Sequence, residues 1–194
     1  VFGMAKDFWF RIGGKAGGLR RLTPSYWGMV LAHMGFAACV VGVVATSQYS
    51  IEHDLKMAPG ETETLAGYEF RFVEVAAVRG PNFVADEARF EVFEDGKKIA
   101  ALAPQKRRYL ASGSMMTEAA IDPGLFRDLY IAMGEPIGEQ GAWAIRLHYK
   151  PMVRWMWLGA ILMGFGGFTT AFDKRYRRHR SGAPARAAGV QYAS

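Results

Sequence analysis

The apolar positions of this chain gather in one long stretch, from Tyr26 to Tyr49, that contains no Asp, Glu, Lys or Arg. At 1.5 Å per helical residue, about 20 of these residues cross the roughly 30 Å hydrocarbon core of a bilayer. Thr23 and Pro24 are typical of a helix start, and the terminal aromatic residues are typical of membrane interfaces. The pattern predicts a transmembrane helix over 23–49. A secretory signal peptide is the rival interpretation, and the length of the apolar run argues against it.

A second uncharged stretch of 18 residues runs from Trp155 to Phe172 and follows Pro151. Arg154 is near enough to its start to reach the membrane surface with its guanidinium group, beside the anchoring tryptophans. The stretch predicts another transmembrane helix, over 151–172. Its glycines are suited to close helix packing in lipid; they are Gly159, Gly164, Gly166 and Gly167.

Glycine recurs every seven residues in the first predicted helix, at Gly28, Gly35 and Gly42, and forms one face for a neighbouring helix. His33 lies about 140° round the helix from Gly28, at 100° per residue. An ionisable side chain inside a membrane helix is costly, and its default interpretation is functional. His33 is therefore the candidate site residue, either as a metal ligand or as a hydrogen-bonding partner of another helix.

The region 50–150 alternates apolar and polar positions with the two-residue period of β-strands. Asp95-Gly96 is a hairpin signal, and Gly80-Pro81-Asn82 is a turn signal. About seven short strands predict a small antiparallel sandwich or partly open barrel between the two helices. The segment 125–133 admits a short helical turn. The clearest alternating positions are Tyr68, Phe70, Phe72, Ala88, Phe90, Val92, Trp143, Ile145, Leu147 and Tyr149.

Charge divides along the chain in the same way. Residues 1–22 carry five Lys or Arg and one acid, residues 173–194 carry six and one, and residues 50–150 carry 12 against 16. Lys and Arg mark the cytoplasmic side of membrane helices. We therefore expect a cytoplasmic juxtamembrane segment over 1–22, a basic cytoplasmic tail over 173–194, and a periplasmic domain over 50–150. The basic balance lies in the two ends rather than on a domain surface, which argues against a nucleic-acid partner.

Two classes of site are excluded by composition and spacing. The single cysteine, Cys39, rules out a disulfide framework and the paired cysteines of a c-type haem attachment motif. The glycines and basic residues of 13–22 do not have the order of a phosphate-binding loop. This segment is expected to be a flexible membrane-proximal loop.

Seven short segments, in the same order, make the chain resemble the C-terminal part of the CcmF family, the membrane haem lyases of bacterial cytochrome c maturation. They are LAHMG at 31–35, SQYS at 47–50, GPNF at 80–83, PQKRRY at 104–109, MTEAAI at 116–121, RDLY at 127–130 and KPMVRWMWLG at 150–159. Family members are longer. Their tryptophan-rich haem-handling segment and its two flanking histidines are not in this sequence.

The resemblance implies a function. The family receives haem from a periplasmic haem chaperone and joins its two vinyl groups to two cysteine thiols of an apocytochrome c. It is also similar to other haem lyases in holding a b-type haem in the membrane between two histidines. His33 matches one of that pair and is expected to be an axial ligand of the haem b iron.

The same resemblance implies a location and partners. The chain is expected to be part of a multi-pass protein of the bacterial inner membrane, and to be inactive as a haem lyase by itself. Because the 50–150 domain contains no cysteine, thiol exchange with the apocytochrome must come from partner proteins. A paralogous lyase dedicated to a multihaem nitrite reductase is one alternative. A non-enzymatic, membrane-anchored β domain that scaffolds an assembly is another.

Other polar residues are open to more than one interpretation. His53 and His148 are expected to be ordinary histidines near the outer membrane surface, and His179 a solvated residue of the tail. A further group either contacts haem propionates or a partner protein, or forms ion pairs within the β domain. Its members are Arg107, Arg108, Tyr109, Glu118, Arg127 and Asp128.

Overall fold

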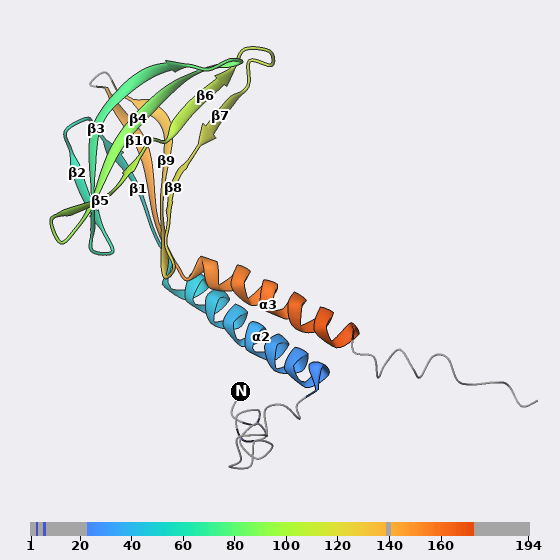
Figure 1. The fold of residues 1–194 in the computed structure, drawn as a ribbon. Coiled ribbons are helices and arrows are strands. Elements are labelled where there is room, and N and C mark those ends of the chain that lie inside the picture. Colours follow the sequence, from blue (N-terminus) through green and yellow to red (C-terminus); the bar gives the residue numbers. More distant parts are fainter. Residues whose placement is uncertain (1–2, 4–5, 7–22, 139–140, 173–194) are drawn as a thin grey trace, which may run out of the picture. The chain divides into compact units, whose positions relative to one another are not determined.

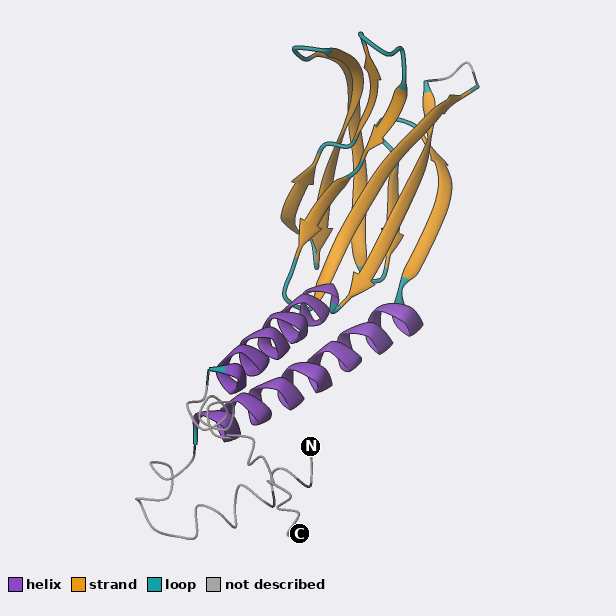
Figure 2. Cartoon of the chain, turned by 90° about the vertical axis from the view of Figure 1, so that its right-hand side faces the viewer, coloured by secondary structure: helices purple, strands orange, loops and turns teal. Residues whose placement is uncertain are grey.

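The computed structural model describes residues 3, 6, 23–138 and 141–172, in which one helix precedes and another follows a set of antiparallel strands along the chain (Figure 1, Figure 2). The elements are α2 (Pro24–Tyr49), β1 (Ile51–Met57), β2 (Thr62–Leu65), β3 (Tyr68–Arg79), β4 (Phe83–Glu94), β5 (Lys97–Leu102), β6 (Gln105–Tyr109), β7 (Met115–Glu118), β8 (Ala120–Pro123), β9 (Arg127–Ile137), β10 (Ala142–Pro151) and α3 (Val153–Ala171). The expected flexible loop over 13–22 and the basic tail over 173–194 lie outside the described residues.

The chain divides into two compact units. One comprises Val1–Ala38 and Leu158–Ser194, and the other comprises Cys39–Trp157. Each helix therefore contributes residues to both units, and the strands belong to the second.

Helix α2 begins as predicted, because the backbone N–H of Tyr26 donates to the hydroxyl oxygen of Thr23 at 3.2 Å. Within the described residues, α2 is the one helix that is long and apolar enough to cross a membrane. Helix α3 has 19 residues and does not meet this criterion. Its arginine, tryptophans and glycines lower its hydropathy, so its membrane span stays a prediction.

The glycine face of α2 packs against α3, as predicted. A Cβ atom added to Gly35 would lie 2.6 Å from the carbonyl oxygen of Gly159, and one added to Gly28 would lie 2.6 Å from that of Gly166. In the other unit, a Cβ on Gly42 would lie 2.8 Å from the backbone nitrogen of Met156. At these distances only glycine lets the two backbones approach so closely.

Two glycines of α3 differ from the prediction. Gly159 and Gly166 are buried and permit close packing. A Cβ on Gly164 or Gly167 would meet nothing within 4 Å, so neither is a packing glycine in the described chain. Helical spacing accounts for this, because Gly167 is turned 100° from Gly166 on the helix.

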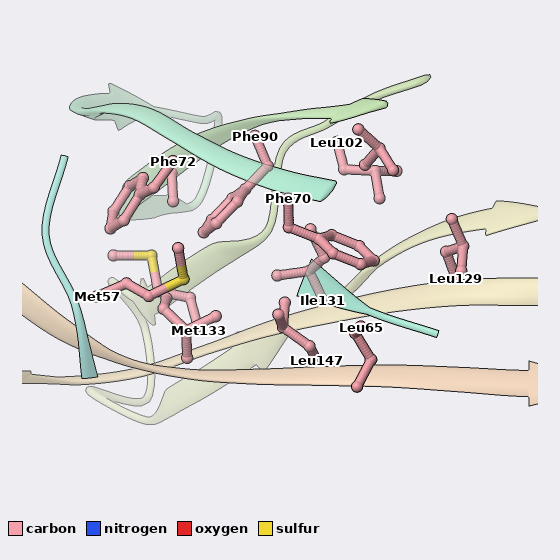
Figure 3. Close-up of a cluster of buried hydrophobic side chains, with 13 residues drawn as sticks. Met57, Leu65, Phe70, Phe72, Phe90, Leu102, Leu129, Ile131, Met133 and Leu147 are labelled. Atoms are coloured by element: carbon pink, nitrogen blue, oxygen red, sulfur yellow. The ribbon is translucent and has the colours of Figure 1, made fainter. Parts of the chain in front are cut away.

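The strands form two antiparallel sheets that enclose one core. The four-stranded sheet has the order β1-β10-β9-β8, and the six-stranded sheet has the order β2-β3-β4-β6-β7 with β5 also paired to β4. Figure 3 shows side chains of both sheets meeting between them. The fully buried members include Met57, Leu65, Phe70, Phe72, Phe90, Val92, Leu129, Ile131, Met133, Ile145 and Leu147. The predicted fold, two helices flanking a small antiparallel sandwich, is confirmed.

Several local predictions can be compared with this architecture. Asp95 and Gly96 join β4 to β5 with φ angles of 48° and 74°, as a hairpin of this kind requires. The described chain has ten strands rather than about seven. The helical turn admitted for 125–133 is wrong, because strand β9 begins at Arg127. Its buried residues recur with a period of two, so burial between the sheets decides the local structure.

Candidate functional site

His33 is held on α2 in a defined orientation. Its Nδ1 atom lies 2.8 Å from the carbonyl oxygen of Met29, one turn earlier in the helix. A carbonyl oxygen can only accept, so Nδ1 carries a proton, and in the neutral imidazole Nε2 then has the lone pair. Within the described residues, Nε2 has no hydrogen-bond partner. The geometry therefore presents Nε2 as a free nitrogen ligand on an exposed imidazole.

An open groove of about 520 Å³ runs beside this imidazole, between α2 and α3. Its walls are Gly28, Met29, Ala32 and His33 of α2 and Gly166, Gly167, Thr170 and Ala171 of α3. The hydroxyl of Thr170 donates to the carbonyl oxygen of Gly166 at 3.0 Å and is already satisfied. Apart from the imidazole, the lining is apolar in character. A nitrogen ligand beside a broad apolar groove suits the iron of a flat, largely apolar macrocycle.

Gly167 is a site residue that sequence reasoning assigned to a different role. It lines the groove, and a side chain there would enter open space rather than α3's partner helix. The seven-residue spacing in α2 identified the packing glycines. The corresponding signal in α3 was the adjacent pair Gly166-Gly167, since neighbouring glycines cannot both face the same helix.

The six polar residues of the β domain that could bind haem propionates or a partner do not lie together at one site. Arg107 pairs with Glu118 at 3.2 Å, on β6 and β7. Arg127 pairs with Asp122, on β9 and β8. The carboxylate of Asp128 accepts the backbone N–H of Gly124 at 3.1 Å. Three of the six residues, Arg107, Glu118 and Arg127, thus form ion pairs within the β domain, which was the second interpretation. Tyr109 packs edge-on against Phe83, and Arg108 makes no ion pair within the described chain.

The two described histidines of the domain differ in their surroundings. The Nδ1 atom of His53 lies 3.6 Å from a carboxylate oxygen of Glu63. The side chain of His148 is only 12% exposed, and its Nδ1 lies 3.5 Å from Glu52. Burial lowers the pKa of His148, although Glu52 acts in the opposite direction. His179 lies outside the described residues.

His148 borders a second groove, of about 560 Å³, on the outer face of the four-stranded sheet. The guanidinium of Arg146 donates two hydrogen bonds to Asp54 across this face, and its side-chain hydrogen bond lowers the pKa of Asp54. Because this arginine is paired on the sheet itself, the described lining of the groove contains no unpaired arginine or lysine. No cluster of three or more His, Cys, Asp or Glu able to hold a metal ion occurs in the described ranges.

The comparison with known families decides the identity. The family described as CcmF C-terminal beta-sandwich matches residues 48–151, more than half of the 194 residues. The chain belongs to the CcmF family. The family resemblance inferred from the seven segments is therefore confirmed.

Matches to individual proteins are longer than the match to the family and extend into the helices. The chain is 54% identical over 164 residues to cytochrome c-type biogenesis protein CcmF of Pseudomonas aeruginosa, which covers 84% of this chain and 25% of that protein. It is 38% identical over 161 residues to cytochrome c-type biogenesis protein NrfE of Haemophilus influenzae, covering 83% and 25%. A solved structure of the cytochrome c haem lyase CcmF superimposes with a TM-score of 0.68 at 18% identity, over 87% of this chain and 28% of that one. The chain thus spans about a quarter of the length of these curated relatives.

Proposed function

We propose that this chain is the C-terminal part of a cytochrome c haem lyase and that His33 is one axial ligand of a membrane b-type haem. One observation carries the proposal. The hydrogen bond from Nδ1 of His33 to the carbonyl of Met29 fixes the tautomer and leaves Nε2 for iron. Iron-ligating histidines commonly have their other ring nitrogen fixed in this way.

The residues present fit part of a haem site. His33 would ligate iron, while Met29, Ala32, Gly167 and Ala171 would form an apolar wall on one side. When bound, the haem supplies an iron centre able to exchange one electron. The residues of this chain would hold the imidazole, line its side of the haem with apolar groups and leave room for the macrocycle. A second axial ligand and an opposite wall are expected from the remaining three quarters of the protein.

The proposed topology places the helices 23–49 and 151–172 in the bacterial inner membrane. Residues 1–22 and 173–194 would be cytoplasmic, and the β domain over 50–150 periplasmic. The basic ends, the acidic domain and the apolar length of α2 support this arrangement. Reporter fusions after Ser181 should be active only in the cytoplasm, and fusions within 95–97 only outside. The opposite pattern would overturn the topology.

The β domain would act as a docking surface for the partners of the reaction: a haem chaperone, an apocytochrome c and its thiol-handling proteins. Support comes from two arginines on one face of the six-stranded sheet. In the strand register Arg79 and Arg108 both lie opposite Val84, and they border a groove of about 530 Å³. Neither has an ion-pair partner among the described residues. A guanidinium pair of this kind suits a carboxylate-bearing partner.

Docking can be tested apart from haem ligation. Replacing Arg79 and Arg108 by Glu should lower cytochrome c yield while the b-type haem content stays unchanged. Arg89→Glu is the matched control, since Arg89 is an exposed arginine of the same sheet that pairs with Glu74 at 2.7 Å. An unchanged yield in the double variant would remove this surface from the proposal.

The reaction proposed for the whole protein is thioether formation, in which each thiol S–H adds across a haem vinyl group. The higher identity to a CcmF than to an NrfE relative favours general cytochrome c maturation over a dedicated lyase. A scaffold without haem is the remaining alternative, and the experiment on His33 separates it from a haem-binding subunit.

The test of the proposed function is His33→Ala in the full-length protein. Loss of one axial ligand should lower both retained b-type haem and cytochrome c yield, with the protein still inserted. Added imidazole should restore part of the haem, because it can occupy the vacated position. His33→Ala with full haem content and an unchanged reduced spectrum would overturn the assignment and leave a scaffold.

A further inference from the structure

The turn between β8 and β9 places two large apolar side chains next to each other at its tip. Leu125 is 57% exposed and Phe126 is 60% exposed. The turn is closed by the backbone N–H of Gly124, which donates to the carbonyl oxygen of Arg127 at 2.8 Å. A Cβ atom on Gly124 would lie 2.5 Å from that oxygen, so the sharp reversal requires glycine. The tip is therefore a defined, apolar projection.

The charged side chains next to the tip are satisfied within the domain. Arg127 pairs with Asp122 and lies over the ring of Tyr68, 5.0 Å from its centroid. Asp128 accepts the backbone N–H of Gly124. These groups consequently do not require water or a charged partner at the tip. What the turn presents outward is apolar.

The tip is also hydrogen-bonded to the beginning of α3. The indole N–H of Trp155 donates to the carbonyl oxygen of Leu125 at 3.1 Å. The backbone N–H of Met152 donates to the carbonyl oxygen of Phe126 at 2.8 Å, and the rings of Phe126 and Trp155 are 6.0 Å apart. Because both hydrogen bonds use backbone carbonyls, they hold the turn without using its side chains.

The end of α2 is joined to the residues that precede α3. The hydroxyl of Thr46 donates to the carbonyl oxygen of Pro151 at 2.7 Å, and Pro151 directly precedes Met152. The last turn of the membrane-length helix and the Leu125–Phe126 tip are thus both joined to 151–152. Tyr49 and Trp157, which are 68% and 69% exposed, are the kind of aromatic residues found where helices leave a bilayer.

We propose that Leu125 and Phe126 insert into the interfacial region of the outer leaflet and form a third membrane contact beside the two helices. The inference rests on the membrane topology proposed above. Neighbouring helix ends alone form a narrow attachment about which a domain can tilt. An apolar third contact restricts that tilt and holds the β domain at one orientation to the membrane surface.

Nitroxide labels in the full-length protein test this inference. The protein is placed in nanodiscs of phosphatidylcholine and phosphatidylglycerol, with Cys39 and any other native cysteine replaced by Ser. Labels are attached at Leu125→Cys or Phe126→Cys. The matched control is Leu110→Cys, a 53% exposed leucine in the β6–β7 turn at the opposite end of the domain (Figure 1). Collisions with oxygen report an apolar surrounding, and collisions with a water-soluble nickel chelate report an aqueous one.

Labels at 125 and 126 should collide more with oxygen than with the nickel chelate, and the label at 110 should show the reverse. Dominant nickel collisions at 125 and 126 would overturn the inference. Protection from both reagents would also overturn it, because another part of the protein would then cover the tip. Haem content of His33→Ala is measured independently of these positions, so this inference and the proposed haem site can fail separately.

Discussion

The β domain buries its large apolar side chains in its own core, whereas the helix pair leaves its large apolar side chains exposed. In the β domain, two sheets close over a shared core in which Phe70, Phe72 and Phe90 have no exposed surface. In the helix pair, Phe36, Phe165 and Phe168 are 62%, 62% and 64% exposed. The buried residues of α3 are two glycines, Gly159 and Gly166, within the described chain. The β domain therefore contains its own interior. The helix pair has only a narrow seam, the line of glycine contacts between α2 and α3.

This difference indicates where each region obtains its stability. Burial of a large apolar side chain is worth about 1.5–3 kcal/mol, so the core of the β domain can support a fold by itself. The helix pair has close backbone packing but leaves its large side chains for lipid or for other helices. We expect the groove beside His33 to be completed from outside this chain for the same reason.

The largest expected effect is a cavity in the β domain. Expressed as residues 50–151, the domain should fold cooperatively and give a sheet-rich circular dichroism spectrum without binding haem. The ring of Phe90 stacks on Phe72 at 4.6 Å, so Phe90→Ala should lower the free energy of unfolding by about 3–5 kcal/mol in urea titrations. Phe93→Ala, on the half-buried outer side of the same strand, should cost clearly less. Tight stoichiometric haem binding by this domain would contradict the assignment of haem binding to the helix pair.

A side chain in the helix seam should have the next largest effect. A Cβ on Gly166 would lie 2.5 Å from the carbonyl oxygen of Gly28, so Gly166→Leu forces the two helices apart. Overpacking of this kind costs about 1–3 kcal/mol. The amount of full-length protein in the membrane should fall on immunoblots. Gly164→Leu is the control, because its side chain enters open space; an equal fall in both variants would contradict the packing role.

A smaller change should affect ligand binding without affecting the seam. Gly167→Leu places a side chain in the groove beside His33, where a Cβ meets no other atom within 4 Å. We expect normal protein level and a reduced haem-to-protein ratio in absorption spectra. Gly164→Leu should retain its haem. A normal ratio in Gly167→Leu would place the ligand elsewhere.

The smallest effect should be the pH dependence of the isolated β domain. Burial lowers the folded-state pKa of His148 below that of the unfolded chain, so the unfolded state binds its proton more readily. The contribution of His148 to the free energy of unfolding is fully present above its unfolded-state pKa of about 6.5. It is lost as the pH falls through the lower folded-state pKa. Urea midpoints should therefore decrease on acidification, with a weaker decrease in His148→Gln. Identical slopes in the two proteins would assign the dependence to other groups.

Sequence reasoning succeeded where one periodicity dominated. The seven-residue repeat of Gly28, Gly35 and Gly42 identified the packing face, and two-residue alternation identified the central strands. It did not distinguish Gly167 from Gly166, because a glycine for packing and one for open space look alike in a sequence. The helical turn admitted for 125–133 failed because alternate residues of β9 are buried against the six-stranded sheet, whose strands come from earlier parts of the chain.

The position of His33 beside the groove also could not be read from α2 alone. Helical angles placed the imidazole away from the glycine face, yet Gly28 and His33 border the same groove. The second wall comes from α3, more than 130 residues later in the chain. Only the packing of the two helices brings these residues together.

The central claim, ligation of haem iron by His33, is tested most directly by the redox potential of His33→Met in the full-length protein. Replacement of one histidine ligand by methionine raises the potential of a haem, whereas loss of a packing residue has no such signature. With His33 as the ligand, the variant should retain haem in the reduced state with a higher midpoint potential and an altered spectrum. An unchanged midpoint and spectrum would contradict it.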